Sequence, residues 1–136
     1  MKKVVLDTNL YIDWINRGLR EDVMLGPGLV RYLSAVVVME LRAGTHTRAG
    51  RTSIDQLVRA YASGSRLISP SRLVFDQAGS LLRKLKLAGQ DVRSASFVND
   101  VLIALTARLI GAVVLTANLR DFEAIRRFEV FELEKA

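Results

Sequence analysis

The sequence contains no cysteine and no long hydrophobic run. Without cysteine the chain forms no disulfide, no thiolate metal site and no cysteine nucleophile, which fits a reducing compartment. The basic start Met1–Lys3 is followed only by the short apolar run Val4–Leu6, whereas a secretory signal needs roughly 7–15 apolar residues. No stretch approaches the roughly 18 apolar residues of a membrane-spanning helix. We therefore expect a cytoplasmic protein with no membrane partner.

Acidic residues and histidine are also scarce. The 136 residues include 14 acidic residues against 20 basic ones and a single histidine, and the formal net charge is +6. This balance favours a polyanionic partner such as nucleic acid, or the acidic surface of another protein, although a generally basic protein would show it too. Half of the residues are hydrophobic, which is enough for a core, and the length fits a single domain over residues 1–136.

Short apolar runs alternate with helical patterns along the chain. We expect strands at 3–6, 30–34, 66–69, 112–115 and 128–133. We expect helices from Thr8 or Asn9 to Gly18 and at 35–43, 54–62, 73–87, 95–110 and 118–127, and a basic polar loop at 45–51. This alternation predicts an α/β fold with a mostly parallel sheet flanked by helices. Such sheets bind ligands at the carboxyl ends of their strands, where Asp7 and Thr116 are expected to lie.

Four carboxylates lie within or beside apolar segments, namely Asp7, Glu40, Asp100 and Asp121. Acidic residues are rarely buried unless a partner or a metal ion neutralises them. A fold that gathers these four makes an oxygen-rich pocket, and its natural occupant is a hard cation such as Mg²⁺ or Mn²⁺. We therefore predict a metal-dependent hydrolase in which Asp7 and Asp100 bind the metal. Glu40 or Asp121 would orient the attacking water.

Each acid also has a purely structural explanation. Asp7 is a possible N-cap of the following helix, and Glu40 is able to form a structural ion pair with Arg42 or Arg83. Asp100 would be a surface residue if its helix were rotated, and Asp121 would interact favourably with a helix N-terminus. The joint placement of the four acids is what favours a common site.

Other polar residues are candidates for contacts with a nucleic-acid substrate. Thr116 and Asn118 are expected to donate hydrogen bonds to the scissile phosphate. Arg42, Arg48 and Arg51 are candidate phosphate-binding residues, although a run of charged residues is more often a solvated surface. The single histidine, His46, lies in the polar loop and is expected to be solvated rather than catalytic.

Four segments resemble the signature blocks of the PIN-domain ribonucleases, and most closely those of the VapC toxins of toxin–antitoxin pairs. In chain order these segments are Val5–Asn9, Met39–Gly44, Asn99–Ala104 and Thr116–Phe122. The resemblance implies a Rossmann-like three-layer fold with strand order 3-2-1-4-5 and a Mg²⁺- or Mn²⁺-dependent endoribonuclease. It also implies a homodimer and inhibition by a cognate antitoxin whose tail enters the active-site groove.

The resemblance further assigns roles to individual residues. The acidic residues of the family fall on Asp7, Glu40, Asp100 and Asp121, of which Asp7 and Asp100 correspond to the metal ligands. The supporting positions fall on Asn9, Thr116 and Asn118.

Three other functions are compatible with an α/β fold of this length. A receiver-like signalling module would need an aspartate after its third strand, where this chain has Ile68–Pro70. A non-catalytic RNA- or protein-binding module is disfavoured because four acids repel phosphate unless a metal bridges them. An RNA-processing nuclease of the same fold that is not a toxin remains an alternative.

Overall fold

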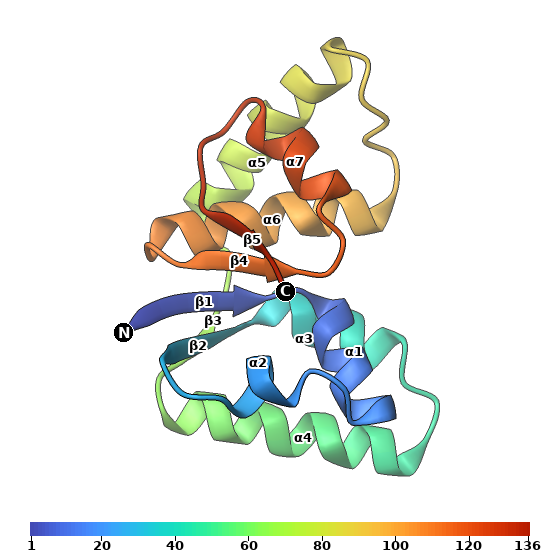
Figure 1. Cartoon of the computed structure of the whole chain (residues 1–136). Helices are drawn as coiled ribbons and strands as arrows, with labels where there is room; N and C mark the ends of the chain where they lie inside the picture. Colours follow the sequence, from blue (N-terminus) through green and yellow to red (C-terminus); the bar gives the residue numbers. More distant parts are fainter.

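The computed structural model describes residues 1–136 and contains a five-stranded sheet with seven helices (Figure 1). The strands are β1 (Lys2–Leu6), β2 (Leu29–Ser34), β3 (Leu67–Ile68), β4 (Val113–Thr116) and β5 (Leu133–Lys135). The helices are α1 (Thr8–Arg17), α2 (Glu21–Leu25), α3 (Ala35–Ala43), α4 (Arg48–Ser63), α5 (Arg72–Leu87), α6 (Ala95–Leu109) and α7 (Arg120–Arg126).

The sheet has the order β3-β2-β1-β4-β5, and every neighbouring pair is parallel. The predicted α/β class and strand order are therefore confirmed. β1 is the central strand, and its Val5 pairs with Tyr32 of β2 on one side and with Val114 of β4 on the other. Helices α1–α4 lie on one side of β1 in Figure 1 and α5–α7 on the other. After β1 the chain adds β2 and β3 on one side of this strand and then β4 and β5 on the other side. Folds of this kind bind ligands at the point where the strand order reverses.

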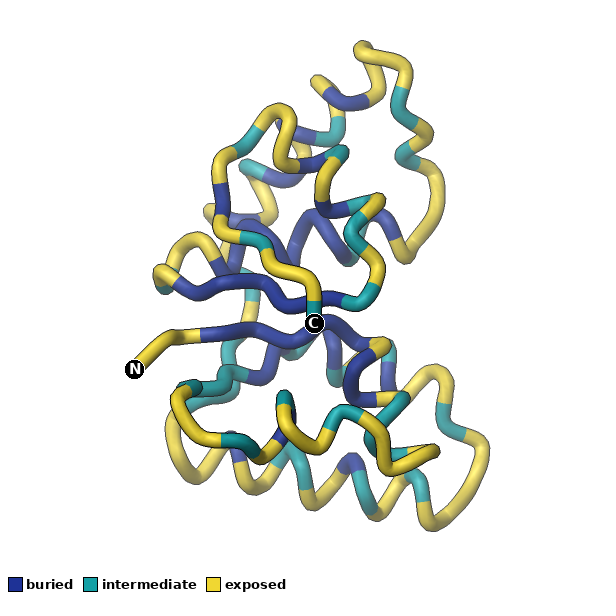
Figure 2. Tube along the Cα trace, in the orientation of Figure 1, coloured by how far each residue is buried: buried dark blue, intermediate teal, exposed yellow.

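The core runs through the central strands and α6. Val4, Val5 and Leu6 of β1 are completely buried, and residues 100–107 of α6 are all buried. Figure 2 shows this buried band through the middle of the molecule, with exposed residues around it. Because helices cover both faces of the sheet, the central strands are continuously apolar rather than alternating. No helix has both the length and the apolar composition that a membrane crossing requires.

The predicted polar loop at 45–51 is wrong beyond Thr47. Helix α4 begins at Arg48, and the Thr47 hydroxyl caps it by accepting a hydrogen bond from the Gly50 amide at 3.0 Å. This cap satisfies an amide that the first helical turn leaves free. The first turns of α4 are mostly exposed, so they lack the apolar periodicity from which a helix is predicted.

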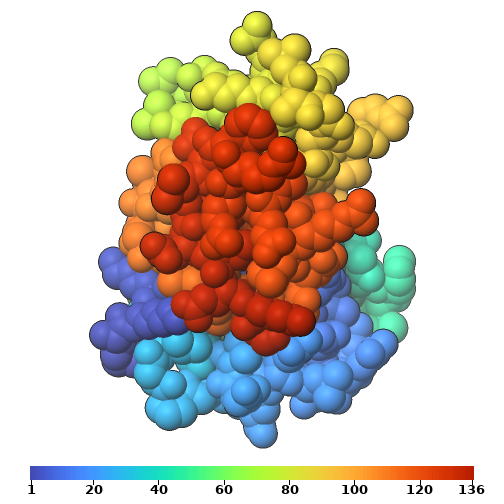
Figure 3. Space-filling model, turned by 45° about the horizontal axis from the view of Figure 1, so that its top comes forward, coloured from blue at the N-terminus to red at the C-terminus, as the bar shows by residue number.

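The last strand also differs from its prediction at 128–133. The structure places β5 at Leu133–Lys135, and the preceding residues connect α7 to the sheet. Phe131 is buried against Phe122 of α7, with ring centroids 6.4 Å apart in an edge-to-face arrangement. The apolar character of this segment therefore reflects packing on a helix rather than strand pairing. In Figure 3 the segment from α7 to the C-terminus lies across the front of the molecule and meets the N-terminal segments.

Candidate active site

The carboxyl ends of β1 and β4 bring Asp7 and Thr116 together. The Thr116 hydroxyl donates a hydrogen bond to Asp7 Oδ2 at 2.9 Å. The Thr8 amide donates to Asp7 Oδ1 at 2.8 Å, so Asp7 rather than Thr8 or Asn9 is the N-cap of α1. The capping explanation for Asp7 is thus confirmed. The same side chain, only 7 % exposed, lies at the carboxyl end of the central strand β1, where sheets of this kind bind ligands.

A hollow of about 240 Å³ opens beside Asp7, and we call it the acidic hollow. Its lining contains all four predicted acids and four of the polar residues around them: Asp7, Thr8, Asn9, Ile12, Glu40, Ser96, Asp100, Asn118 and Asp121. These residues come from α1, α3, α6, α7 and the ends of β1 and β4. Of the predicted residues, only Thr116 and the three arginines do not line it. Thr8 and Ser96 line the hollow although their side chains were not predicted to do so.

Asp100 is buried without a hydrogen-bond donor or a cationic partner. Its side chain is 8 % exposed on α6, and it receives no hydrogen bond from another residue. Burial, followed by the negative charges of Asp7, Asp121 and Glu40, raises the pKa of Asp100 to about 8. A buried carboxyl in this setting needs a proton or a cation to neutralise it.

The pKa of Asp7 is affected by opposing interactions. Burial raises it, and the hydrogen bonds from Thr116 and Thr8 lower it. The nearby charges of Glu40 and Asp121 raise it again, and the net pKa lies above the usual value for aspartate. Asp7 and Asp100 are therefore the two acids whose ionised forms the fold disfavours most clearly.

Glu40 is held by a hydroxyl rather than by an arginine. The Thr8 hydroxyl donates a hydrogen bond to Glu40 Oε1 at 2.7 Å. Of the two arginines considered as partners from the sequence, Arg42 instead pairs with Asp55 at 2.9 Å, and Arg83 forms no ion pair with Glu40. Glu40 therefore contributes its negative charge to the acidic hollow without a cationic partner.

Thr116 and Asn118 differ in what they offer a substrate. Thr116 is completely buried, and its hydroxyl contacts Asp7 and accepts a hydrogen bond from the Asn118 amide at 3.0 Å. The Thr116 hydroxyl therefore orients Asp7, and its contact with the scissile phosphate stays a prediction. Asn118 is exposed and lines the acidic hollow, so its side-chain amide is accessible to a substrate.

The arginines predicted to bind substrate lie outside the acidic hollow. Arg48 and Arg51 are exposed near the start of α4, and Arg42 is engaged with Asp55. A separate hollow on α7 is lined by Arg120, Glu123, Ala124, Arg126 and Arg127. Helix α7 also carries Asp121 of the acidic hollow. The three basic side chains of the α7 hollow therefore lie on or directly after a helix that borders the acidic hollow.

The donor set of the acidic hollow fits a hard divalent cation. All of its candidate ligands are oxygen atoms, and Asp100 presents a buried carboxyl without a hydrogen-bond donor. No three acidic or histidine side chains converge closely enough to enclose an ion. Mg²⁺ does not require such a cage, because it keeps several waters and commonly binds one or two carboxylates. Asp7 and Asp100 are the two carboxylates that suit it best.

We expect Thr116→Val to lower the metal affinity of the acidic hollow while the protein still folds. The substitution removes the hydroxyl that holds Asp7 Oδ2, and a lost buried hydrogen bond costs about 1–3 kcal/mol of stability. It should also lower the affinity of the acidic hollow for Mn²⁺, measured by metal titration. Thr106→Val is the matched control, because the buried Thr106 hydroxyl bonds the Leu102 carbonyl at 2.7 Å outside the hollow. Equal metal affinity in the two variants would contradict the role given to Thr116.

Known proteins share the fold of this chain. The PIN domain family model matches residues 4–127. Similar solved structures include VapBC2 from Rickettsia felis bound to a promoter DNA fragment, at 23 % identity with 98 % of each chain covered and a TM-score of 0.72. DNA-bound VapBC from Salmonella typhimurium matches at 27 % identity with 99 % of this chain and 98 % of that chain covered and a TM-score of 0.71. VapBC-1 from nontypeable Haemophilus influenzae matches at 22 % identity with 98 % and 97 % covered and a TM-score of 0.69.

No curated protein sequence matches the chain. The family model nevertheless covers most of its length, including all four predicted acids. The chain belongs to the PIN-domain family.

Proposed function

We propose that this protein is a Mg²⁺- or Mn²⁺-dependent endoribonuclease and the toxin of a toxin–antitoxin pair. One observation carries the nuclease proposal, namely the acidic hollow at the carboxyl ends of β1 and β4 with the unpartnered Asp100 inside it. Four carboxylates together repel a phosphodiester unless a cation lies between them. The four acids therefore fit a phosphoryl-transfer site in which a bound metal ion lies between the carboxylates and the phosphate.

Asp7 and Asp100 would hold the metal, and the other residues have roles around it. Bound there, Mg²⁺ or Mn²⁺ would supply positive charge that polarises the phosphoryl group and lowers the pKa of the attacking water. Glu40 and Asp121 accept hydrogen bonds from that water and orient it. Asn118, and Asn9 on α1, donate to phosphate oxygens. Thr8 and Thr116 keep Glu40 and Asp7 in position.

The charge distribution supports RNA as the substrate. The net charge of +6 favours a polyanion. The hollow on α7 offers Arg120, Arg126 and Arg127 to phosphates that flank the cleaved bond. Arg48 and Arg51, exposed on α4, would contact a longer substrate.

The similar solved structures support an antitoxin partner. They are VapBC toxin–antitoxin complexes that cover nearly the whole chain. We expect the cognate antitoxin to place a cationic side chain in the acidic hollow, where it would neutralise the acids in place of the metal. We also expect a cytoplasmic homodimer, and inhibition of translation through the cleaved RNA.

Metal-dependent cleavage tests the proposed function directly. Purified protein, free of antitoxin and shown to be folded, is incubated with a mixture of structured RNAs in Mg²⁺ or Mn²⁺. We expect endonucleolytic products in either metal and none in excess EDTA, because the acids repel the substrate without a cation. Absence of cleavage in both metals, or cleavage that persists in EDTA, would contradict the proposal.

A further inference from the structure

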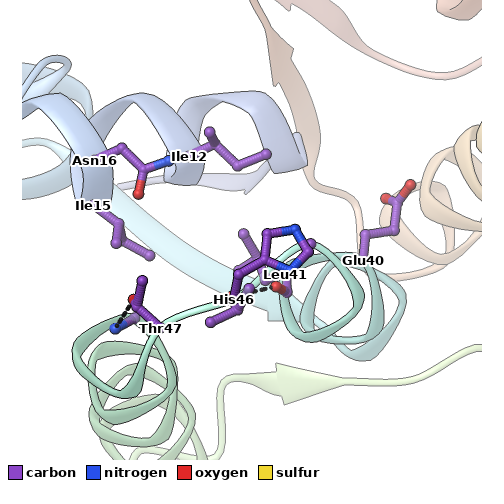
Figure 4. A pocket seen from close by; sticks show the side chains of 10 residues that line it. Ile12, Ile15, Asn16, Glu40, Leu41, His46 and Thr47 are labelled. Carbon is purple, nitrogen blue, oxygen red and sulfur yellow. Dashed lines mark hydrogen bonds between the residues drawn. The ribbon is translucent and has the colours of Figure 1, made fainter.

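Another hollow adjoins the acidic hollow, and the proposed function gives it no role. Its volume is about 260 Å³, and it lies between α1 and the chain from α3 to the start of α4 (Figure 4). Ile12 and Glu40 line both this side hollow and the acidic hollow. A molecule bound in the acidic hollow therefore reaches the side hollow past these two side chains.

The side hollow combines apolar walls with two free polar side chains. Ile12, Ile15 and Leu41 supply the apolar surface, and Asn16 and His46 are polar and exposed. Figure 4 shows Asn16 on the α1 side and His46 on the opposite side. Neither side chain takes part in a hydrogen bond within the protein, so both are available to a ligand.

The other polar groups of the side hollow are already occupied. The Thr45 hydroxyl donates to the Leu41 carbonyl at 2.7 Å, and the Thr47 hydroxyl accepts from the Gly50 amide at 3.0 Å. The hollow contains no lysine or arginine, and Glu40 borders it. This chemistry suits an uncharged ring with a hydrogen-bonding edge and does not suit a phosphate.

We propose that the side hollow binds the nucleobase next to the phosphodiester that is cleaved. Proteins recognise single-stranded RNA by stacking unpaired bases on side chains such as histidine and by hydrogen bonding to the base edges. His46 would stack on the base, and the Asn16 amide would offer its edge both a donor and an acceptor. The volume lies just below the roughly 300–1,000 Å³ of pockets for drug-sized ligands, which fits a single base.

The shared wall places this base beside the site of cleavage. Because Glu40 borders both hollows, a nucleotide whose phosphate lies in the acidic hollow has its own or the adjacent base within reach of the side hollow. Asn16 and His46 would then determine sequence preference at that nucleotide. This inference rests on the proposed nuclease function and adds a specificity site to it.

Cleavage of a random-sequence RNA library, with every cut site mapped, tests this assignment. The wild-type protein in Mn²⁺ should show a base preference at a nucleotide directly beside the cut. Asn16→Ala should weaken or change that preference. His46→Ala should lower cleavage of the preferred sequence about tenfold, as expected for a lost stacking contact, and His46→Phe should recover most of it. The matched control is Gln56→Ala, which removes an amide from the neighbouring hollow between α1 and α4 and should leave the preference unchanged.

The possible outcomes distinguish a failure of the side-hollow assignment from a failure of the proposed nuclease function. Asn16 and His46 are exposed, so their replacement should leave the fold and the thermal midpoint unchanged. Wild-type cleavage without a base preference beside the cut would overturn the side-hollow assignment and leave the nuclease intact. An unchanged preference in both Asn16→Ala and His46→Ala would do the same. Absence of wild-type cleavage in both metals would overturn the nuclease function and the assignment together.

Discussion

Asp100→Asn is expected to abolish RNA cleavage while leaving the fold intact. The substitution keeps the size of the side chain but removes the negative charge with which Asp100 would hold the metal. Loss of metal catalysis should lower the cleavage rate by about a thousandfold or more, corresponding to at least roughly 4 kcal/mol of transition-state stabilisation. The measurement is the single-turnover cleavage rate in saturating Mn²⁺, together with circular dichroism of the same preparation.

Two further variants make this result specific to the acidic hollow. Asp7→Asn should lose activity to a similar extent, because Asp7 is the second proposed metal ligand. Asp76→Asn is the matched control, since Asp76 is an exposed aspartate on α5 outside the hollow and should retain full activity. Normal cleavage by purified Asp100→Asn would remove the assignment of the metal site. Equal losses in Asp76→Asn would show that the effect is not local.

Much of the fold follows from local patterns in the sequence. The apolar runs that became β1 and β4 are short, continuous and flanked by helical patterns, and this combination is typical of a buried parallel sheet. Helix α3 was predicted with its bounds at Ala35–Ala43, and Ser34 caps it by accepting from the Val36 amide at 3.2 Å. Where a capping residue and an apolar stripe agree, the element is found at its predicted place.

The misplaced elements share a physical cause. Residues 48–51 form the polar start of α4, and the helix there depends on the Thr47 cap. The strand expected at 128–133 lies further along, because Phe131 packs on α7 instead of on a neighbouring strand. In both places the structure depends on contacts that hydrophobic periodicity does not represent.

In the acidic hollow, too, the local sequence indicates the acidic residues, whereas the contacts between them depend on the fold. The four acids were recognised because each one lies within or beside an apolar segment, and the fold brings all of them to one hollow. The hydrogen bond from Thr8 to Glu40 joins residues 32 positions apart and exists only because α1 and α3 lie together. Asn16 and His46 likewise face one another across a hollow that no local pattern indicates.

The metal-free protein is expected to lose stability as the pH rises from about 6 to about 8. The pKa of Asp100 is about 8 in the folded protein, against 3.8 for an unperturbed aspartate. Between these values the folded state keeps a proton that the unfolded state has released. The free energy of unfolding therefore decreases with rising pH, by up to about 1.4 kcal/mol per pH unit for one group. The stability contributed by the neutral carboxyl is present at low pH and is lost as the pH rises through 8.

This pH dependence distinguishes the buried Asp100 from ordinary acids. Exposed carboxylates titrate below pH 6 and do not contribute in this window. Urea unfolding in EDTA at pH 6, 7 and 8 measures the effect, and Asp100→Asn should flatten the profile and be the more stable protein at pH 8. Asp76→Asn should follow the wild type.

The same profile also tests whether the proton and the metal compete for one carboxyl. Mg²⁺ or Mn²⁺ stabilises the folded state by binding to it, and ionised Asp100 is the form that binds. The gain in stability on adding metal should therefore be larger at pH 8 than at pH 6, and it should be small in Asp100→Asn. A wild-type profile that is flat without metal, or a metal gain that does not change with pH, would show that Asp100 is already ionised. The ionised carboxylate of Asp100 would then be stabilised by the protein even without a metal ion. If the profile and the metal gain both behave as expected, the ionisation of Asp100 links the lower stability of the metal-free protein at high pH to its stronger binding of a divalent cation.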